Sequence, residues 1–345
     1  MFLRLHVNND KEVEELLEYY IGYGQIKRED KEEIKRIFKS YYNNYCFSEL
    51  FDERVHNSNM VLYFLNEYMK RNRVPDNSDL VDASFSSDYG KLRYLVQKGS
   101  STNKNYEKLI DLVTYGSVEE TLIKSFKLEK IKDTNAFISL LYYLGLLTIK
   151  GKGEIEGYEF EIPNDAVRSI DYEYIKDALR ETYDLEVGFY SDLNGLFAYM
   201  ARDGKWEAPL KKILDIYYKF VPVRDGVLKE VALKLFAFSF LIQDKFHFAT
   251  SERELNRGYS DIYLETHMMF NHITNYEYII EFKYLTSEKK VTKALINKAR
   301  KEAEAQLAQY ENDRKVIAAR KAGKEVKKIV VIGSSQKVEL MEEVK

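Results

Sequence analysis

The stretch Ser251–Tyr284 reads SERELNRGYSDIYLETHMMFNHITNYEYIIEFKY and contains two runs in which apolar and polar residues alternate. Asp261 lies near the start of the first run, and the triplet Glu281-Phe282-Lys283 lies inside the second. The spacing of 20 residues between Asp261 and Glu281 suits a strand, a turn and a returning strand. Such a hairpin would bring two carboxylates and one ammonium to a single point.

Two carboxylates and an ammonium form a group that binds a hard divalent cation beside a phosphodiester. Mg²⁺ takes oxygen ligands and keeps positions for water and phosphate, so Asp261 and Glu281 are the expected metal ligands. The backbone carbonyl of Phe282 is a further candidate ligand. Lys283 shares a strand face with Glu281, where it would orient the attacking water or stabilise charge in the transition state. The pattern therefore predicts a nuclease that depends on Mg²⁺ or Mn²⁺.

The chain has 345 residues, of which 32% are charged and 45% hydrophobic, a composition typical of a soluble globular protein. The net charge is −3, so nucleic-acid binding would need a local basic surface. Cys46 is the only cysteine, which excludes an internal disulfide and a cysteine-rich zinc site and fits a reducing cytoplasm. The sequence shows neither a membrane-spanning apolar run nor a signal-peptide pattern at its first residues.

The first part of the chain has helical periodicity over residues 10–42 and 57–71, and Asn57 is a candidate N-cap. A further helix is expected over residues 135–144, ending at Gly145. A glycine-containing hairpin with strands 146–149 and 158–162 follows, and Pro163-Asn164 begins the next helix. A helix followed by such a hairpin is typical of a winged helix. We favour a role in packing neighbouring domains together over a role in DNA recognition, because the hairpin carries little net charge for contacts with phosphates.

The second part predicts helices within residues 205–245, of which 227–244 is apolar nearly all round and should be buried. Three strands, one long helix over 291–313 and a last strand, KKIVVIGSS, follow. This order predicts an α/β sandwich with a central mixed sheet, within an α+β chain. We expect three segments: a helical and winged-helix-like region at 1–184, a helical connector at 185–224 and a nuclease-like domain at 225–345.

The two motifs GYSDIYLE and YIIEFKYL resemble the core motifs of the PD-(D/E)XK nuclease superfamily, with Asp261, Glu281 and Lys283 at the motif positions. The similarity is to the subgroup that follows an AAA-ATPase-like domain in bacterial proteins. It implies two further site residues, Glu252 in the SERELN lead-in, with Glu254 as its competitor, and Gln306 in EAEAQLAQY, with Tyr310 nearby. In this subgroup, the resemblance implies that Gln306 and Tyr310 contact the scissile phosphate or the attacking water. The proline of the superfamily name is absent, because Ser260 precedes Asp261.

The first part resembles the same subgroup. YYNNYCFSE is similar to a Y-N-G-Y-x-F-S segment in which Asn44 stands at the glycine position. These segments normally follow a nucleotide-binding core, yet the chain contains no G-x-x-x-x-G-K-[ST] motif. We therefore expect this chain alone to lack ATP hydrolysis. A separate ATPase and a second copy of the chain are the expected protein partners.

Residues 283–328 contain fourteen Lys or Arg and six Asp or Glu, a local balance of +8. This excess indicates either a surface that follows a DNA backbone or a solvated helix with ion pairs such as Lys298–Glu302. Two other functions remain open beside DNA cleavage: a nuclease-fold module that binds nucleic acid or a partner without cutting, and an inactive remnant of an ATPase-coupled nuclease. For His267, His272 and Cys46, core or surface positions are favoured over ligand or nucleophile roles.

Overall fold

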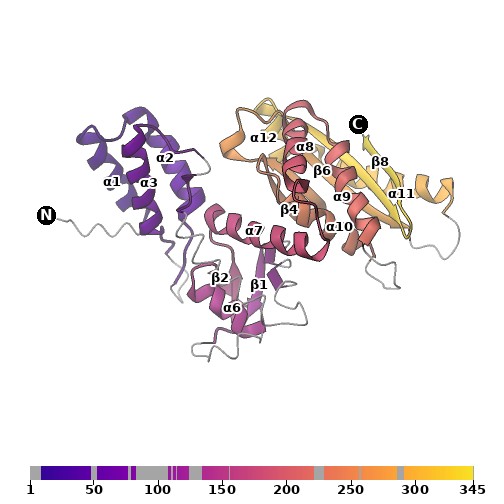
Figure 1. The fold of residues 1–345 in the computed structure, drawn as a ribbon, viewed down its shortest axis with the longest axis horizontal. Coiled ribbons are helices and arrows are strands. Elements are labelled where there is room, and N and C mark those ends of the chain that lie inside the picture. The colour runs from indigo at the N-terminus through magenta and orange to yellow at the C-terminus, as the bar shows by residue number, and fades with distance from the viewer. Residues whose placement is uncertain are drawn as a thin grey trace. The chain divides into compact units, whose positions relative to one another are not determined.

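The computed structural model describes residues 9–47, 53–76, 79–82, 108–109, 112–113, 115–123, 134–154, 156–220, 229–255, 258–285 and 291–344. Within these ranges the side chains of residues 134, 135, 178, 229, 252–255 and 258–261 are not described. The chain forms two compact units, Met1–Tyr174 and Ile175–Lys345, each of which is taken by itself (Figure 1).

The first unit begins with three helices: α1 (Asp10–Gly22), α2 (Lys31–Ile37) and α3 (Ser58–Arg71). A short 3-10 turn (Arg28–Asp30) precedes α2, and a π-helical turn (Phe38–Tyr42) follows it. Phe38 and Phe64 meet edge to face in the core between the helices, with their ring centroids 5.0 Å apart. The Asn57 side chain accepts a hydrogen bond from the Met60 amide, so the predicted cap and the two predicted helical regions are confirmed.

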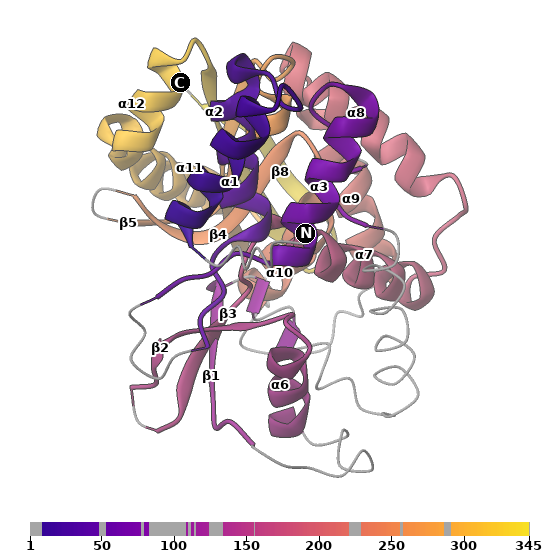
Figure 2. The same cartoon turned by 90° about the vertical axis from the view of Figure 1, so that its left-hand side faces the viewer.

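A three-stranded antiparallel sheet completes the first unit. It consists of β1 (Ser117–Glu120), β2 (Thr148–Lys152) and β3 (Tyr158–Glu161) in the order β1-β3-β2. Helix α6 (Thr134–Tyr143) lies beside these strands (Figure 2). Gly145, two residues after its end, adopts the left-handed conformation expected of a C-terminal cap. Helix α7 (Asp165–Thr182) starts directly after Pro163-Asn164, where the Asn164 side chain accepts from the Val167 amide.

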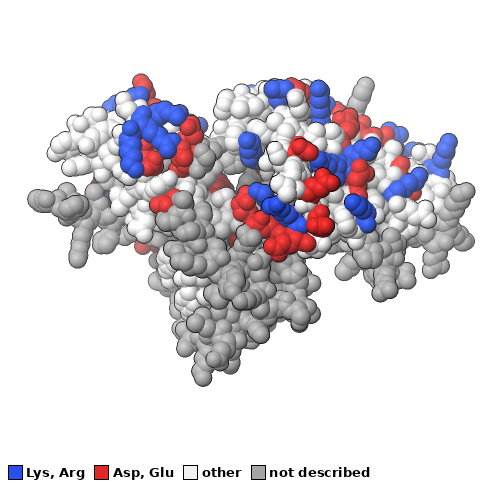
Figure 3. Space-filling view, viewed as in Figure 1, with Lys and Arg blue, Asp and Glu red and all other residues white. Residues whose placement is uncertain are grey.

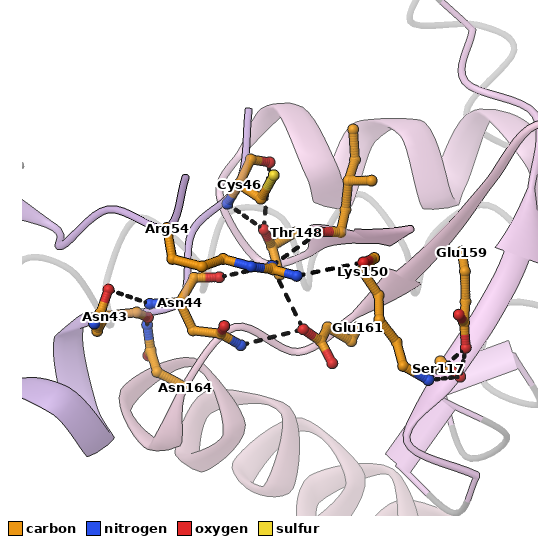
Figure 4. Close-up of polar contacts among 11 residues, drawn as sticks. Asn43, Asn44, Cys46, Arg54, Ser117, Thr148, Lys150, Glu159, Glu161 and Asn164 are labelled. Carbon is orange, nitrogen blue, oxygen red and sulfur yellow. Dashed lines mark hydrogen bonds and ion pairs between the residues drawn. The ribbon is translucent and has the colours of Figure 1, made fainter. Parts of the chain in front are cut away.

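Arg54 forms hydrogen bonds to the backbone of strand β2 (Figure 4). The pairing of β2 and β3 is irregular between Ile149 and Gly151. The Arg54 guanidinium donates to the carbonyls of Ile149 at 2.9 Å and Lys150 at 3.3 Å. Arg54 also lies 3.6 Å from the Glu161 carboxylate. The guanidinium therefore bonds backbone carbonyls at the irregular part of the hairpin.

The second unit contains helices α8 (Phe189–Asp203), α9 (Glu207–Phe220) and α10 (Lys229–Leu241). The predicted burial of α10 is confirmed, because Leu233, Ala237, Phe238 and Phe240 are at most 1% exposed. An apolar helix of this kind is stable only when other elements cover it on most sides. Here it packs against the sheet of the same unit: its Leu233 lies against Gly333.

The sheet of the second unit has five strands in the order β4-β5-β6-β7-β8. They are β4 (His247–Leu255), β5 (Gly258–Thr266), β6 (Tyr276–Leu285), β7 (Glu325–Ser334) and β8 (Val338–Val344). A 3-10 turn (Met268–Phe270) lies in the β5–β6 connection. Strands β6 and β7 are parallel and the other neighbours are antiparallel, so the predicted mixed sheet is confirmed.

One sequence-based expectation for this unit was wrong. Strand β7 is not the last element, because the acidic segment VELMEEV adds β8, whose weak apolar alternation hid it. The long helix expected over 291–313 is confirmed as α11 (Lys293–Ala308), which passes directly into a 3-10 turn (Gln309–Asn312). Helix α12 (Arg314–Lys321) follows, and the side chain of its N-cap residue Asp313 accepts from the Lys315 amide.

The sheet lies between two helical layers (Figure 1). Ala299, Ala303 and Leu307 of α11 are buried against Ile279 and Val330 of the sheet. On the opposite face, the Tyr278 hydroxyl donates to the Met200 carbonyl of α8 at 2.6 Å. Because strand residues alternate between faces, Glu277, Ile279, Glu281 and Lys283 share the α11 side of β6.

Candidate active site

Glu281 and Lys283 are in contact on strand β6. The Lys283 ammonium donates to Glu281 Oε1 at 3.0 Å. The Glu281 side chain is 2% exposed and that of Lys283 17% exposed. A carboxylate buried to this degree needs a charged or hydrogen-bonding partner, and β6 supplies one two residues further along the same face. The predicted pairing of these two side chains on one strand face is therefore present.

The strand register brings the predicted acidic positions into line. Ser251 pairs with Ile262 and Arg253 with Ser260, so residues 252 and 261 stand opposite each other. Ile262 of β5 pairs with Ile280 of β6, and the next residues on these two strands are Asp261 and Glu281. Backbone positions 252, 261 and 281 thus form one row across β4, β5 and β6, which we call the acidic row.

The remaining predicted residues differ in how far the structure describes them. The side chains of Asp261 and Glu252 lie outside the described residues, as does that of Glu254. Phe282 is buried in β6, where it is paired with Val331 of β7. Gln306 is half-buried on α11. Tyr310 is 2% exposed within the apolar core that α11 forms with the sheet.

A second carboxylate near Lys283 comes from helix α10, where sequence reasoning did not place a site residue. Glu230 Oε2 accepts a hydrogen bond from the Tyr284 backbone amide at 3.0 Å. Glu230 Oε1 lies 4.0 Å from the Lys283 ammonium. The only signal in the sequence was one acidic residue at the start of a largely apolar helix.

The opposite end of β6 holds a buried polar cluster instead of site residues. His247 Nδ1 lies 2.6 Å from Asp244 Oδ2, and His247 Nε2 lies 2.9 Å from the Tyr276 carbonyl. Both the His247 and the Asp244 side chains are fully buried. Nearby, the Tyr263 hydroxyl donates to Glu277 at 2.5 Å. Since Tyr276 begins β6 and Lys283 lies near its end, His247 belongs to the packing of the sheet.

Much of the basic surface predicted over residues 283–328 is engaged in ion pairs. Lys298 lies 3.9 Å from Glu302, as expected, and Lys315 lies 3.3 Å from Glu265. Arg300 contacts Glu304 and Glu342, and Glu311 contacts Arg320 and Lys328. Figure 3 shows basic and acidic side chains interspersed over the second unit on the face in view. Lys289 and Lys290 lie outside the described residues.

The other sequence candidates occupy ordinary structural positions. Cys46 is buried, and its backbone amide donates to the Thr148 hydroxyl at 2.6 Å. His267 Nδ1 accepts from the Met269 amide at the start of a 3-10 turn. Among the side chains that the structure describes, no three His, Cys, Asp or Glu residues lie close enough to hold a metal ion. No helix in the described ranges has the length and apolar character needed to cross a membrane.

Searches of curated proteins and of solved structures find no match to this chain. A family model does match, over residues 228–343. This segment contains α10, all five strands of the sheet, and the helices α11 and α12. The segment that carries Glu230, the acidic row and Lys283 therefore matches the model of the PD-(D/E)XK nuclease superfamily.

Proposed function

We propose that the second unit hydrolyses phosphodiester bonds in DNA with the help of Mg²⁺ or Mn²⁺. The acidic row carries this proposal: residues 252, 261 and 281 align across three adjacent strands within a segment that matches a nuclease family model. Residues directly opposite each other in antiparallel strands project to the same face, about 4.5–5.5 Å apart at Cβ. Three carboxylates on such a row would converge on the α11 side of the sheet.

The chemistry of this row fits a hard divalent cation. Asp261, Glu281 and Glu252 offer carboxylate oxygens only, which are the ligands that Mg²⁺ and Mn²⁺ accept. The Phe282 backbone carbonyl, next to Glu281 on β6, is a further candidate ligand. When bound, the cation would supply Lewis-acid stabilisation of the phosphate and a more acidic water.

Lys283 has the position required of a group that assists hydrolysis. Its ammonium lies beside Glu281 and is mostly withdrawn from solvent, where a positive charge acts more strongly on its neighbours than in water. It would orient the attacking water and stabilise the negative charge that develops on the phosphate oxygens. We also propose that Gln306 of α11 contacts the phosphate or the attacking water, because the segment EAEAQLAQY resembles the corresponding superfamily segment.

The first unit supports an association with a separate ATPase. Asn44 adopts φ = 77°. Glycine enters that conformation without strain, and asparagine does so more readily than most other residues. Asn44 therefore suits the position that the ATPase-associated subgroup gives to glycine. This agreement supports a nuclease that works beside a nucleotide-hydrolysing protein.

Cleavage assays with several substrates test this function. The purified chain is incubated with Mn²⁺, Mg²⁺ or EDTA and with plasmid, duplex DNA, single-stranded DNA or RNA. We expect the chain to cleave DNA only in the presence of a divalent cation. We expect the Asp261→Asn variant to lack this cleavage. Equal cleavage in EDTA, or by Asp261→Asn, would contradict the proposal. Cleavage of RNA alone would support phosphodiester hydrolysis but contradict DNA as the substrate.

A further inference from the structure

The Lys283 ammonium lies between two carboxylates that come from different elements. Glu281, on the same strand, is 3.0 Å away, and Glu230, on α10, is 4.0 Å away. The nearer carboxylate is almost fully buried and the farther one is 46% exposed. At these distances the ammonium is hydrogen-bonded to Glu281, and a movement of about 1 Å would bring it into hydrogen-bonding range of Glu230.

Glu230 is held in place independently of Lys283. Its Oε2 accepts from the amide of Tyr284, the residue that follows Lys283 on β6. Its other oxygen, Oε1, is the one nearest to the lysine ammonium. A carboxylate that is already fixed by a backbone bond loses little conformational freedom when it gains a second partner. Glu230 is therefore prepared to receive the ammonium.

A cation at Glu281 would compete with Lys283 for the same carboxylate. The ammonium would then be repelled by the doubly charged ion, while its side chain is only 17% exposed. Loss of the Glu281 carboxylate would disfavour this mostly buried ammonium, and Glu230 Oε1, 4.0 Å away, would offset that loss.

We propose that Glu230 is a positioning residue that takes over the Lys283 ammonium when a divalent cation binds at Glu281. This inference rests on the proposed function, because it needs a cation at that carboxylate. Glu230 holds the lysine beside the phosphate and lowers the free-energy cost of displacing it from Glu281. Its effect on cation binding consequently depends on Lys283, and that dependence separates this role from direct ligation of the ion.

A double-mutant cycle on Mn²⁺ binding tests the inference without measuring activity. Calorimetric titrations are run on the full chain, and the heat that Glu281→Ala abolishes reports the site. Glu230→Gln keeps an oxygen for the Tyr284 amide but removes the charge. The substitution is made in the wild-type chain and in Lys283→Met. Glu302→Gln is the control, because it also removes a carboxylate close to a lysine, at 3.9 Å from Lys298.

We expect Glu230→Gln to weaken Mn²⁺ binding about threefold to tenfold in the wild-type chain and less than about twofold in Lys283→Met. Equal weakening in both backgrounds would identify Glu230 as a direct ligand and overturn the inference, and so would no weakening in either. If no heat in the wild-type chain depends on Glu281, the proposed function itself fails. Circular dichroism and thermal midpoints establish that each variant is folded.

Discussion

The Lys283 ammonium donates to Glu281 Oε1 across 3.0 Å, within one face of strand β6. The pair lies next to the row in which residues 252, 261 and 281 are aligned across three strands. An ion pair that served only to satisfy a buried glutamate would not require aligned acidic positions on the two neighbouring strands. This combination is the reason for assigning phosphodiester chemistry to the pair.

The acidic row distinguishes Glu252 from its neighbour Glu254. Residue 252 stands opposite 261, whereas Glu254 pairs with Tyr259, two positions further from the row. We expect Glu252→Gln to lower the rate of Mn²⁺-dependent DNA cleavage about tenfold or more, because a charged ligand is lost. Glu254→Gln should stay within about twofold of the wild-type rate. The reverse order of the two rates would show that this register does not define the site.

The sequence predicted much of this sheet because its strands have strong patterns. The alternating runs around Asp261 and Glu281 predicted two antiparallel strands and the face of each residue, as the pairing of β5 with β6 shows. Strand β8 was missed because Glu339, Glu342 and Glu343 interrupt its apolar residues. Glu230 was missed for a different reason: more than 50 residues separate it from Lys283, and only the packing of α10 against β6 brings them together. Tertiary contacts of this kind leave no local signal.

Position 44 should tolerate glycine better than alanine, because the φ of 77° that Asn44 adopts is strained for most residues with a Cβ. We expect Asn44→Ala to lower the free energy of unfolding by about 1–2 kcal/mol. Asn44→Gly should change it by less than about 1 kcal/mol, although the amide contact with Glu161 is lost. Urea unfolding of both variants measures this difference. Equal stability of the alanine variant and the wild-type chain would contradict the strain argument.

Glu311 should contribute to stability through the buried Lys328. The Lys328 side chain is only 8% exposed and contacts Glu311. Glu311→Ala leaves that ammonium without this carboxylate, and we expect a loss of about 2–3 kcal/mol in the free energy of unfolding. The control Glu302→Ala, which breaks the exposed pair with Lys298, should cost less than about 0.5 kcal/mol. Adding Lys328→Met to Glu311→Ala should restore most of the loss, and failure to do so would contradict the explanation.

The same ion pairs determine how Glu311 responds to acid. Hydrogen bonds from Arg320 and Lys328 lower the pKa of Glu311 to about 2. Because the folded-state pKa is below the ordinary value of 4.5, the stabilisation is fully present above that value. It is lost as the pH falls toward 2. The stability difference between the wild-type chain and Glu311→Gln should therefore shrink between pH 4.5 and 2, and a constant difference over that range would contradict the assignment.

His247 should titrate above the ordinary histidine range. Burial opposes the charged ring and is the largest single influence on its pKa, but the Asp244 carboxylate and the Tyr276 carbonyl outweigh it, so the pKa is raised. Both ring nitrogens face acceptors, which requires a doubly protonated ring when Asp244 is ionised. The resulting stabilisation is fully present below pH 6.5 and is lost as the pH rises through the raised pKa.

Two measurements test the charge on His247. The NMR signal of its ring protons should titrate above pH 6.5, the ordinary value, in the wild-type chain. The stability lost in Asp244→Asn should be greatest below pH 6.5 and should decrease as the pH rises, because the substitution removes the carboxylate that favours the charged ring. A ring that titrates at or below pH 6.5 would show that burial dominates.

The central claim is that Glu281 and Lys283 act together on a phosphodiester. It is tested most directly by the rate of Mn²⁺-dependent plasmid cleavage by Glu281→Ala and Lys283→Ala, each purified beside the wild-type chain and shown to be folded. We predict that both rates fall about 100-fold or more, which corresponds to a loss of about 3 kcal/mol of transition-state stabilisation. Cleavage by both variants at the wild-type rate would contradict the claim and place the activity at another site or in another protein.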